Sequence, residues 1–155
     1  MKSRKGFGST SERTESAERG KDYKMRKAEH DEYCKRIAEK LKEIVLGHKY
    51  TCPYCGNQYD EPQKDDLCEC GEYLEPMSVY DYFRDALDIE YRVNGKHADE
   101  INSVKIMITC GGPNVYVDTE EKKVLLYWWN ENGEAWLDDD VVEAVNEFAN
   151  EIWNC

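Results

Sequence analysis

The 155-residue chain contains no run of about 18 or more apolar residues, which argues against a transmembrane helix. Residues 1–30 are polar and rich in charge, glycine and serine, and they lack the apolar centre of a secretory signal. The stretch GGPN at residues 111–114 lacks the Lys and Ser/Thr that complete a phosphate-binding loop. The first two absences lead us to expect a soluble cytoplasmic protein.

Seven cysteines cannot all pair in disulfides, and four of them form two close pairs between Cys52 and Cys70. The pairs read CPYCG and CECG, and twelve residues separate Cys55 from Cys68. The glycine after each pair tolerates the backbone conformation with which a knuckle folds around a metal ion. Such pairs suit thiolate ligands in a reducing compartment better than a secreted disulfide framework.

Four thiolates satisfy tetrahedral zinc and leave no position for a reacting water, so we predict a structural Zn²⁺. His48 as the fourth ligand, iron in a rubredoxin-like site and a thiol redox pair are the alternatives. The predicted ligands are Cys52, Cys55, Cys68 and Cys70.

The net charge of −12 is distributed unevenly along the chain. Residues 1–50 carry 14 Lys/Arg against 9 Asp/Glu, residues 51–75 carry 1 against 7, and residues 76–155 carry 6 against 17. We expect a basic front segment that meets phosphates or an acidic protein, and an acidic body that repels nucleic acid and suits a basic partner. Solubility alone is the competing explanation of the negative charge.

We divide the chain into a flexible tail (1–21), an amphipathic basic helix (22–47), a zinc-ribbon-like module (48–75) and an acidic α+β domain (76–155). Apolar residues recur at steps of three and four in the helix, and Gly47 is placed to end it. The basic side chains off this apolar stripe are either phosphate contacts or an ordinary solvated face. They are Lys35, Arg36, Lys40 and Lys42.

In the acidic domain, Ser78 and Asp81 resemble a capping box at the start of a short core helix. Alternating apolar residues then predict four strands, in IEYRV, SVKIMIT, VYVDT and KKVLLYWWN, joined by short turns as in an antiparallel meander. A final helix is predicted over residues 138–153. The predicted fold is therefore α+β, a four-stranded antiparallel sheet with helices on one face, preceded by the N-terminal helix and the small zinc-ribbon-like module.

Cys110 in TCGGPN suggests a nucleophile with His97 as its base, but nothing nearby explains a lowered thiol pKa. We favour the interpretation in which Cys110 ends a strand and a turn follows. Three acids at the start of the last helix suggest a divalent-cation site, as do residues 99–100, although capping and the helix macrodipole explain them as well. We include these three acids among the candidate partner contacts: Asp138, Asp139 and Asp140.

The aromatic string YWW at residues 127–129 falls in a predicted strand, where neighbouring side chains point to opposite faces. If Trp129 enters the core with Tyr127, then Trp128 faces outward or lies under another element. An exposed tryptophan on an acidic surface is typical of an interaction hot spot, so Trp128 and Trp136 are candidate partner contacts. Burial under the first helix or the cysteine module is the alternative.

Residues 50–75 resemble the zinc-ribbon knuckles of transcription, replication and phage proteins, which contact nucleic acid or protein. With one Lys against seven acids, this ribbon favours a protein contact or a strut, because it would repel phosphates. Residues 77–155, with LDIEYRV, CGGPNVYVDT and YWW, resemble a family of small, acidic, uncharacterised proteins of phages and mobile elements of Firmicutes. This resemblance implies a mobile-element accessory protein that acts on a host or defence factor. The helix and ribbon at the front depart from the short members of that family.

No nucleophile, base and oxyanion donors assemble in the sequence, and no open metal site does, so we expect a binding protein rather than an enzyme. The leading hypothesis is an anti-CRISPR-like inhibitor or adaptor. It docks on the basic, nucleic-acid-binding surface of a host or defence protein, such as a CRISPR nuclease, by presenting carboxylates where phosphates would sit. The alternatives are a zinc-ribbon regulator that binds nucleic acid through the basic helix, and an enzyme that uses Cys110. We expect no membrane partner.

Overall fold

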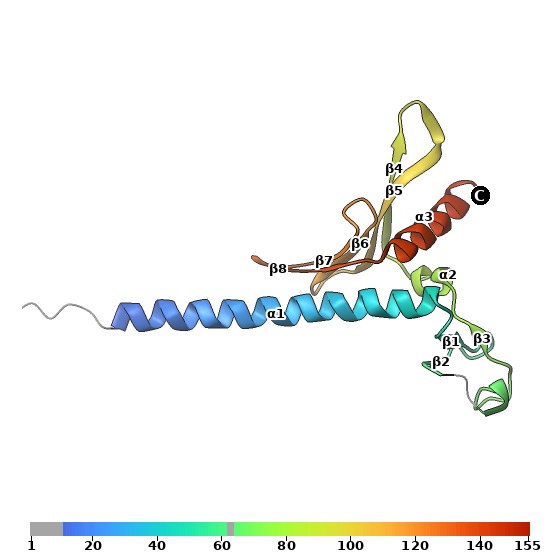
Figure 1. Ribbon diagram of the computed structural model, residues 1–155, viewed down its shortest axis with the longest axis horizontal. Helices are drawn as coiled ribbons and strands as arrows, with labels where there is room; N and C mark the ends of the chain where they lie inside the picture. Colours follow the sequence, from blue (N-terminus) through green and yellow to red (C-terminus); the bar gives the residue numbers. More distant parts are fainter. Residues whose placement is uncertain (1–10, 62–63) are drawn as a thin grey trace, which may run out of the picture.

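The computed structural model describes residues 11–61 and 64–155, which form an α+β protein with two antiparallel sheets (Figure 1). The larger sheet is a five-stranded meander in the order β4-β5-β6-β7-β8, and the smaller sheet has the order β2-β1-β3. The elements are α1 (Ser11–Val45), β1 (Tyr50–Thr51), β2 (Gln58–Tyr59), the 3₁₀ turn η1 (Lys64–Asp66), β3 (Glu75–Pro76), α2 (Val79–Phe83), β4 (Asp88–Asn94), β5 (His97–Thr109), β6 (Asn114–Asp118), β7 (Lys123–Trp128), β8 (Glu131–Trp136) and α3 (Asp139–Trp153).

The first helix is longer than predicted, because α1 begins at Ser11 rather than near residue 22. Residues 11–21 are therefore helical instead of part of a tail, and residues 1–10 of that predicted tail lie outside the described chain. The predicted end is confirmed: Gly47 has a φ of 76°, and its N–H donates to the carbonyl of Ile44 at 3.0 Å. The N–H of His48 donates to the carbonyl of Glu43 at 2.8 Å, which completes a left-handed helix cap.

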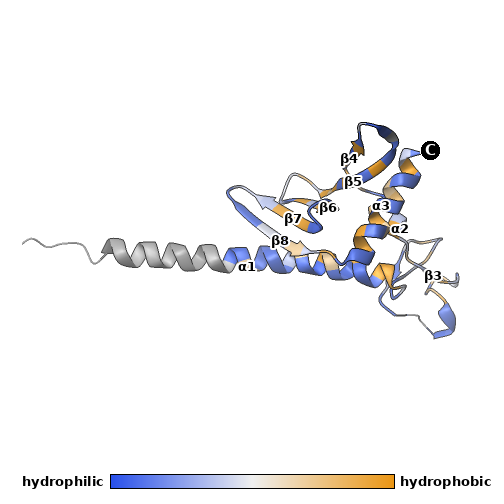
Figure 2. Cartoon of the chain, turned by 45° about the horizontal axis from the view of Figure 1, so that its top comes forward, coloured by the Kyte–Doolittle hydropathy of each residue, from blue (hydrophilic) through white to orange (hydrophobic). Residues whose placement is uncertain are grey.

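Helices α1 and α3 bury the same face of the five-stranded sheet, so the core is a single layer between helices and strands. Hydrophobic residues gather where α2, α3 and the C-terminal part of α1 come together (Figure 2). Among the described residues, no helix is both long enough and apolar enough to cross a bilayer. The buried side chains include Cys34, Ala38 and Leu41 of α1, Val104, Ile106, Val115, Val117, Val124 and Leu126 of the sheet, and Val141, Val145, Phe148 and Ala149 of α3.

The prediction of a four-stranded sheet is wrong, because β8 adds a fifth strand beside β7. Its sequence, ENGEAW, lacks the alternation of apolar residues that marks a strand, and its Asn-Gly pair is typical of a turn. Gly133 is needed here for contact with α1 instead: a Cβ on it would stand 2.5 Å from the carbonyl carbon of His30. Asp31 of α1 also accepts a hydrogen bond from the backbone N–H of Glu134 at 2.9 Å, so α1 covers this sheet edge.

The two helices of the acidic domain, α2 and α3, lie where the sequence predicts them. Ser78 caps α2, and its capping box with Asp81 is confirmed, with Ser78 N–H donating to the Asp81 carboxylate at 2.8 Å and Asp81 N–H to Ser78 Oγ at 3.2 Å. Helix α3 begins at Asp139, one residue after its predicted start. Phe83 of α2 stacks on Phe148 of α3 with ring centroids 5.5 Å apart, which joins the two helices.

The opposite face of the five-stranded sheet carries no helix in the described part of the chain (Figure 1). Cross-strand neighbours there alternate in charge, from Glu90 through Lys105 and Asp118 to Lys123. Asp118 is fully buried and ion-paired with the Arg92 guanidinium, with N–O distances of 3.1 and 3.3 Å. This pairing neutralises a carboxylate that burial would otherwise make costly.

Candidate metal centre and neighbouring surfaces

The two cysteine pairs form two backbone knuckles at one end of the molecule, next to the C-terminal end of α1 (Figure 1). In the first knuckle the N–H of Gly56 donates to the carbonyl of Cys52 at 2.9 Å, and in the second the N–H of Gly71 donates to that of Cys68 at 2.8 Å. Both glycines have positive φ angles, 75° and 92°. The predicted reason for a glycine after each pair is therefore confirmed.

The four cysteine sulfurs all lie within 4.8 Å of one another and form a cluster that can hold a metal ion. The Sγ–Sγ distance is 3.6 Å between Cys52 and Cys70 and 3.5 Å between Cys55 and Cys68. A disulfide requires about 2.05 Å, whereas four sulfurs about 2.3 Å from a tetrahedral ion stand about 3.8 Å apart. The spacing therefore fits a metal tetrahedron and not a pair of disulfides.

Hydrogen bonds around the cluster favour thiolates in each knuckle. The backbone N–H of Cys70 and then the hydroxyl of Tyr59, 3.2 Å from the sulfur, lower the pKa of Cys68 to about 6. The backbone N–H of Cys55 lowers the pKa of Cys52.

The pKa values of the other two cysteine thiols shift in the opposite direction. Backbone hydrogen bonds at Asn57 and Glu72 favour the thiolates of Cys55 and Cys70, but burial and the neighbouring thiols together outweigh them. The net effect raises the pKa of Cys55 and raises that of Cys70 to about 12. Four thiolates at this spacing repel one another, and a cation among them offsets that repulsion.

His48 lies outside this cluster. Its Nδ1 is 3.2 Å from a carboxylate oxygen of Glu43, and the imidazole is largely exposed. Among the described residues, the four cysteines form the one group of His, Cys, Asp and Glu side chains close enough to share a metal ion. The alternative of His48 as a fourth ligand is therefore not supported, and the predicted four-cysteine set is the one that comes together.

The remaining cysteines do not form a reactive pair. Cys34 is buried in the main core, where burial, followed by the charge of Asp31, raises its thiol pKa to about 12. Cys110 follows the C-terminal end of β5, whereas His97 begins the same strand. Thirteen residue steps of an extended strand separate them by roughly 40 Å. The sequence-based idea that His97 acts as base for Cys110 is thus wrong.

Two of the three predicted acids at the start of α3 contact lysines. Asp138 lies 2.7 Å from Nζ of Lys42, and Asp139 lies 2.8 Å from Nζ of Lys122, which lowers the pKa of Asp139. Asp140 is exposed. Asp138 is the N-cap residue of α3 but its side chain makes no capping hydrogen bond, so the run acts through its lysine contacts and the helix dipole.

The predicted basic face of α1 is largely engaged within the chain. Lys42 pairs with Asp138, and Lys40 donates to the side-chain carbonyl of Gln58 at 3.1 Å. Lys35 lies 3.8 Å from Glu39 one turn away. Arg36 is exposed and makes no ion pair with another described residue. Of the four predicted cations, Arg36 is the one for which the described residues show no such contact.

The aromatic residues of the β7–β8 hairpin are exposed, so the alternative in which Trp129 enters the core with Tyr127 does not occur. Trp129 is 89 % exposed, Trp136 is 69 % exposed, and Tyr127 and Trp128 are partly exposed. Trp128 pairs with Glu131, which places Trp129 in the turn rather than in the strand. Its φ of 53° is uncommon for a tryptophan. This turn is not predictable as a hairpin turn, because β8 itself carries no strand pattern.

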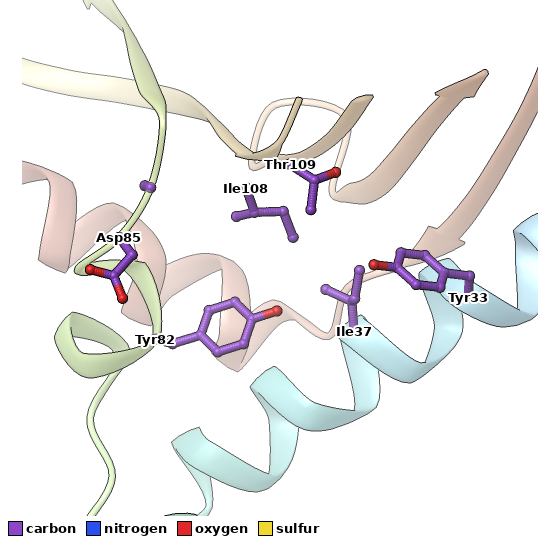
Figure 3. A pocket seen from close by; sticks show the side chains of 7 residues that line it. Tyr33, Ile37, Tyr82, Asp85, Ile108 and Thr109 are labelled. Atoms are coloured by element: carbon purple, nitrogen blue, oxygen red, sulfur yellow. The ribbon is translucent and has the colours of Figure 1, made fainter. Parts of the chain in front are cut away.

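A cavity of about 240 Å³ lies between α1, the α2 region and the end of β5 (Figure 3). Tyr33 and Ile37 line it from α1, and Tyr82 and Ile108 approach from the opposite sides. Burial raises the pKa of Tyr82 to about 12, so its hydroxyl keeps its proton. Neither histidine nor cysteine is among the residues that line this cavity, and we assign it no chemistry.

The fold and the cysteine cluster define an α+β protein with a four-cysteine site that can hold a metal ion. No family model, no curated protein and no solved structure matches this chain. The resemblance of residues 77–155 to small proteins of phages and mobile elements stays a prediction.

Proposed function

We propose that the protein is a non-enzymatic, zinc-stabilised binding protein that docks on the basic, nucleic-acid-binding surface of another protein. The observation that carries this proposal is a set of exposed tryptophans on an acidic domain. Such side chains supply most of the affinity in many interfaces. They are Trp128, Trp129 and Trp136.

Charge supports a basic partner. Residues 76–155 carry a net charge of −11, from 6 Lys/Arg and 17 Asp/Glu. On α3 four exposed carboxylates follow one another at helical spacing, roughly 5–6 Å apart along one face. None of them makes an ion pair with another described residue, so their charge is available to a partner. They are Asp140, Glu143, Glu147 and Glu151.

The metal has a structural role in this proposal. Four cysteine ligands leave a tetrahedral ion no open position, and we assign it as zinc because thiolate-rich knuckles of this kind commonly hold that ion. The cysteine module then acts as a strut beside the acidic body. An accessory protein of a phage or mobile element that inhibits a defence factor, such as a CRISPR nuclease, is the biological setting we propose.

Competition with nucleic acid tests this function. Purified CRISPR nucleases are loaded with fluorescently labelled DNA or RNA, and release of the label is measured as the protein is added at 50 and 200 mM salt. We expect release that weakens steeply with salt, because carboxylates replace phosphates on a basic surface. If none of the tested nucleases releases its nucleic acid, the proposal is wrong.

Two variants that each remove four negative charges make the test more specific. One neutralises the four α3 carboxylates (Asp140→Asn, Glu143→Gln, Glu147→Gln and Glu151→Gln), and the other neutralises four acids of the cysteine module (Glu61→Gln, Asp65→Asn, Asp66→Asn and Glu69→Gln). We expect the first variant to compete at least about tenfold more weakly and the second to resemble the unmodified protein. Equal behaviour of the two variants would mean that total charge, and not the acidic body, accounts for the competition.

A further inference from the structure

A groove runs between the β5–β6 loop and the tip of the β7–β8 hairpin. Its volume is about 450 Å³, enough for one long side chain of a partner. The loop contributes backbone from Gly111 and Gly112, and a Cβ on Gly112 would already touch the Trp128 ring at 4.0 Å. The hairpin contributes three aromatic rings. The groove-lining aromatics are Tyr127, Trp128 and Trp129.

Nearby aromatic rings of the same sheet already hold cations of this chain. Nζ of Lys105 lies 4.9 Å from the centroid of the Tyr116 ring, and Nζ of Lys123 lies 4.4 Å from that of Trp136. The attraction comes from the negative face of the aromatic ring. Among the described residues, no Lys or Arg takes such a position over the three groove-lining rings.

The charged groups around the groove favour a cation over an anion. Burial raises the pKa of Tyr127, and the carboxylates of Glu121, Asp118 and then Glu134 raise it further, so the field at its hydroxyl is negative. Arg26, a basic residue beside the tip, is 3.2 Å from Glu131 in an ion pair. An acidic partner or a phosphate would meet repulsion at Tyr127.

The exposure and backbone conformation of Trp129 indicate a role in binding rather than in stabilising the fold. Its ring contacts Trp128 edge to face at a centroid distance of 6.3 Å, yet it is 89 % exposed and its backbone has a φ of 53°. Asn or Gly adopts such a backbone at lower cost, and strained residues of this kind cluster at binding sites.

We propose that this groove receives an arginine or lysine side chain of the basic partner, held by cation–π contacts with Tyr127, Trp128 and Trp129. The inference rests on the proposed function, since it assigns the site at which the basic partner is bound. The aliphatic stem of the partner side chain lies along the Gly111–Gly112 backbone, and its charged head faces the rings.

A labelled peptide of nine arginines is the probe, with a nine-glutamine peptide as the neutral control, and binding is measured by fluorescence anisotropy. The main variant is Trp129→Asn, because asparagine suits the backbone of the turn and removes the aromatic ring. We expect the arginine peptide to bind about tenfold more weakly to this variant, while the thermal midpoint is unchanged or higher. A parallel variant, Trp128→Leu, is expected to weaken binding as well.

Tyr73→Leu is the matched control, because Tyr73 of the cysteine module is an exposed aromatic residue, 67 % exposed, that does not line the groove. Its affinity for the arginine peptide is expected to stay within twofold of the unmodified protein. The inference is overturned if Trp129→Asn and Trp128→Leu bind as tightly as the unmodified protein, if all three variants weaken equally, or if the unmodified protein prefers neither peptide.

Failure of this inference is distinct from failure of the proposed function. If the protein displaces nucleic acid from a nuclease and Trp129→Asn does so equally well, the function stands and the groove is excluded. If the arginine peptide occupies the groove but no nuclease releases its nucleic acid, the groove stands and the proposed partner class is excluded.

Discussion

At the scale of single residues, Gly133 lets α1 lie directly on β8. A Cβ at this position would stand 2.5 Å from the carbonyl carbon and 2.7 Å from the carbonyl oxygen of His30. Both atoms belong to helix backbone, which cannot rotate aside as the end of a side chain can. Any larger residue must therefore push the helix away from the sheet.

We predict that Gly133→Ala destabilises the protein by about 1–3 kcal/mol, the usual cost of forcing extra volume into a packed contact. Urea unfolding followed by tryptophan fluorescence measures the change. Gly95→Ala is the control, because nothing lies within 4 Å of a Cβ at Gly95 and its φ is not positive. Equal unfolding midpoints for the two variants would show that α1 does not press on β8.

The hydroxyl of Tyr59 gives a second prediction at this scale. It lies 3.2 Å from the sulfur of Cys68 and favours the thiolate. Removing such an outer hydrogen bond commonly costs about 10–100-fold in metal affinity, so Tyr59→Phe should bind zinc at least about tenfold more weakly. Competition with a chromophoric chelator measures this, with Tyr54→Phe as control, since Tyr54 is 82 % exposed. If Tyr59→Phe bound zinc as tightly as the unmodified protein, the Tyr59 hydroxyl would not contribute to metal affinity.

The metal-site residues were predictable from the sequence, and the position of Trp129 was not. Cysteine spacing and the glycine after each pair are local constraints of a knuckle, so Cys52 and Gly56 could be assigned without knowing the fold. The exposure of Trp129 depends on a turn whose second strand, β8, has one face against α1 and few apolar side chains. That contact is distant in sequence, and no local pattern encodes it.

At the scale of elements, α1 is the scaffold that joins the two halves of the chain. Its buried residues pack on β7 and β8, and its C-terminal end leads into the cysteine module. The sequence predicted this end, because Gly47 has a strong conformational reason to stop a helix. It did not predict the start at Ser11, because the polar residues before residue 22 carry no apolar stripe.

The docking of α1 depends on Leu41, which is fully buried in the main core. We predict that Leu41→Ala lowers the free energy of unfolding by about 2–5 kcal/mol, because the cavity adds to the lost burial. Leu46→Ala, at a site that is 50 % exposed after the helix, should change it by less than about 0.5 kcal/mol. Thermal unfolding monitored by circular dichroism compares the two. Similar losses from both substitutions would contradict the packing described for α1.

At the scale of the whole molecule, the hydrophobic residues form two separate clusters. The larger joins the three helices to the five-stranded sheet, and the smaller consists of Cys52, Cys68 and Leu74 with Tyr50 and Tyr59 against them. A cluster of that size cannot by itself hold a segment of about 25 residues, so we expect the metal to stabilise the small sheet. The acidic body shares the larger core with α1, and we expect it to stay folded without the ion.

Hydrogen exchange with and without a chelator tests this division most directly. Peptide-resolved mass spectrometry is applied to the metal-loaded protein and to the protein stripped of metal, with metal content measured in both samples. We predict that amides of residues 50–76 lose protection on metal removal, while those of β5, β6, β7 and α3 keep it. Loss of protection throughout the chain would contradict the account, because the acidic body would then depend on the metal for its fold.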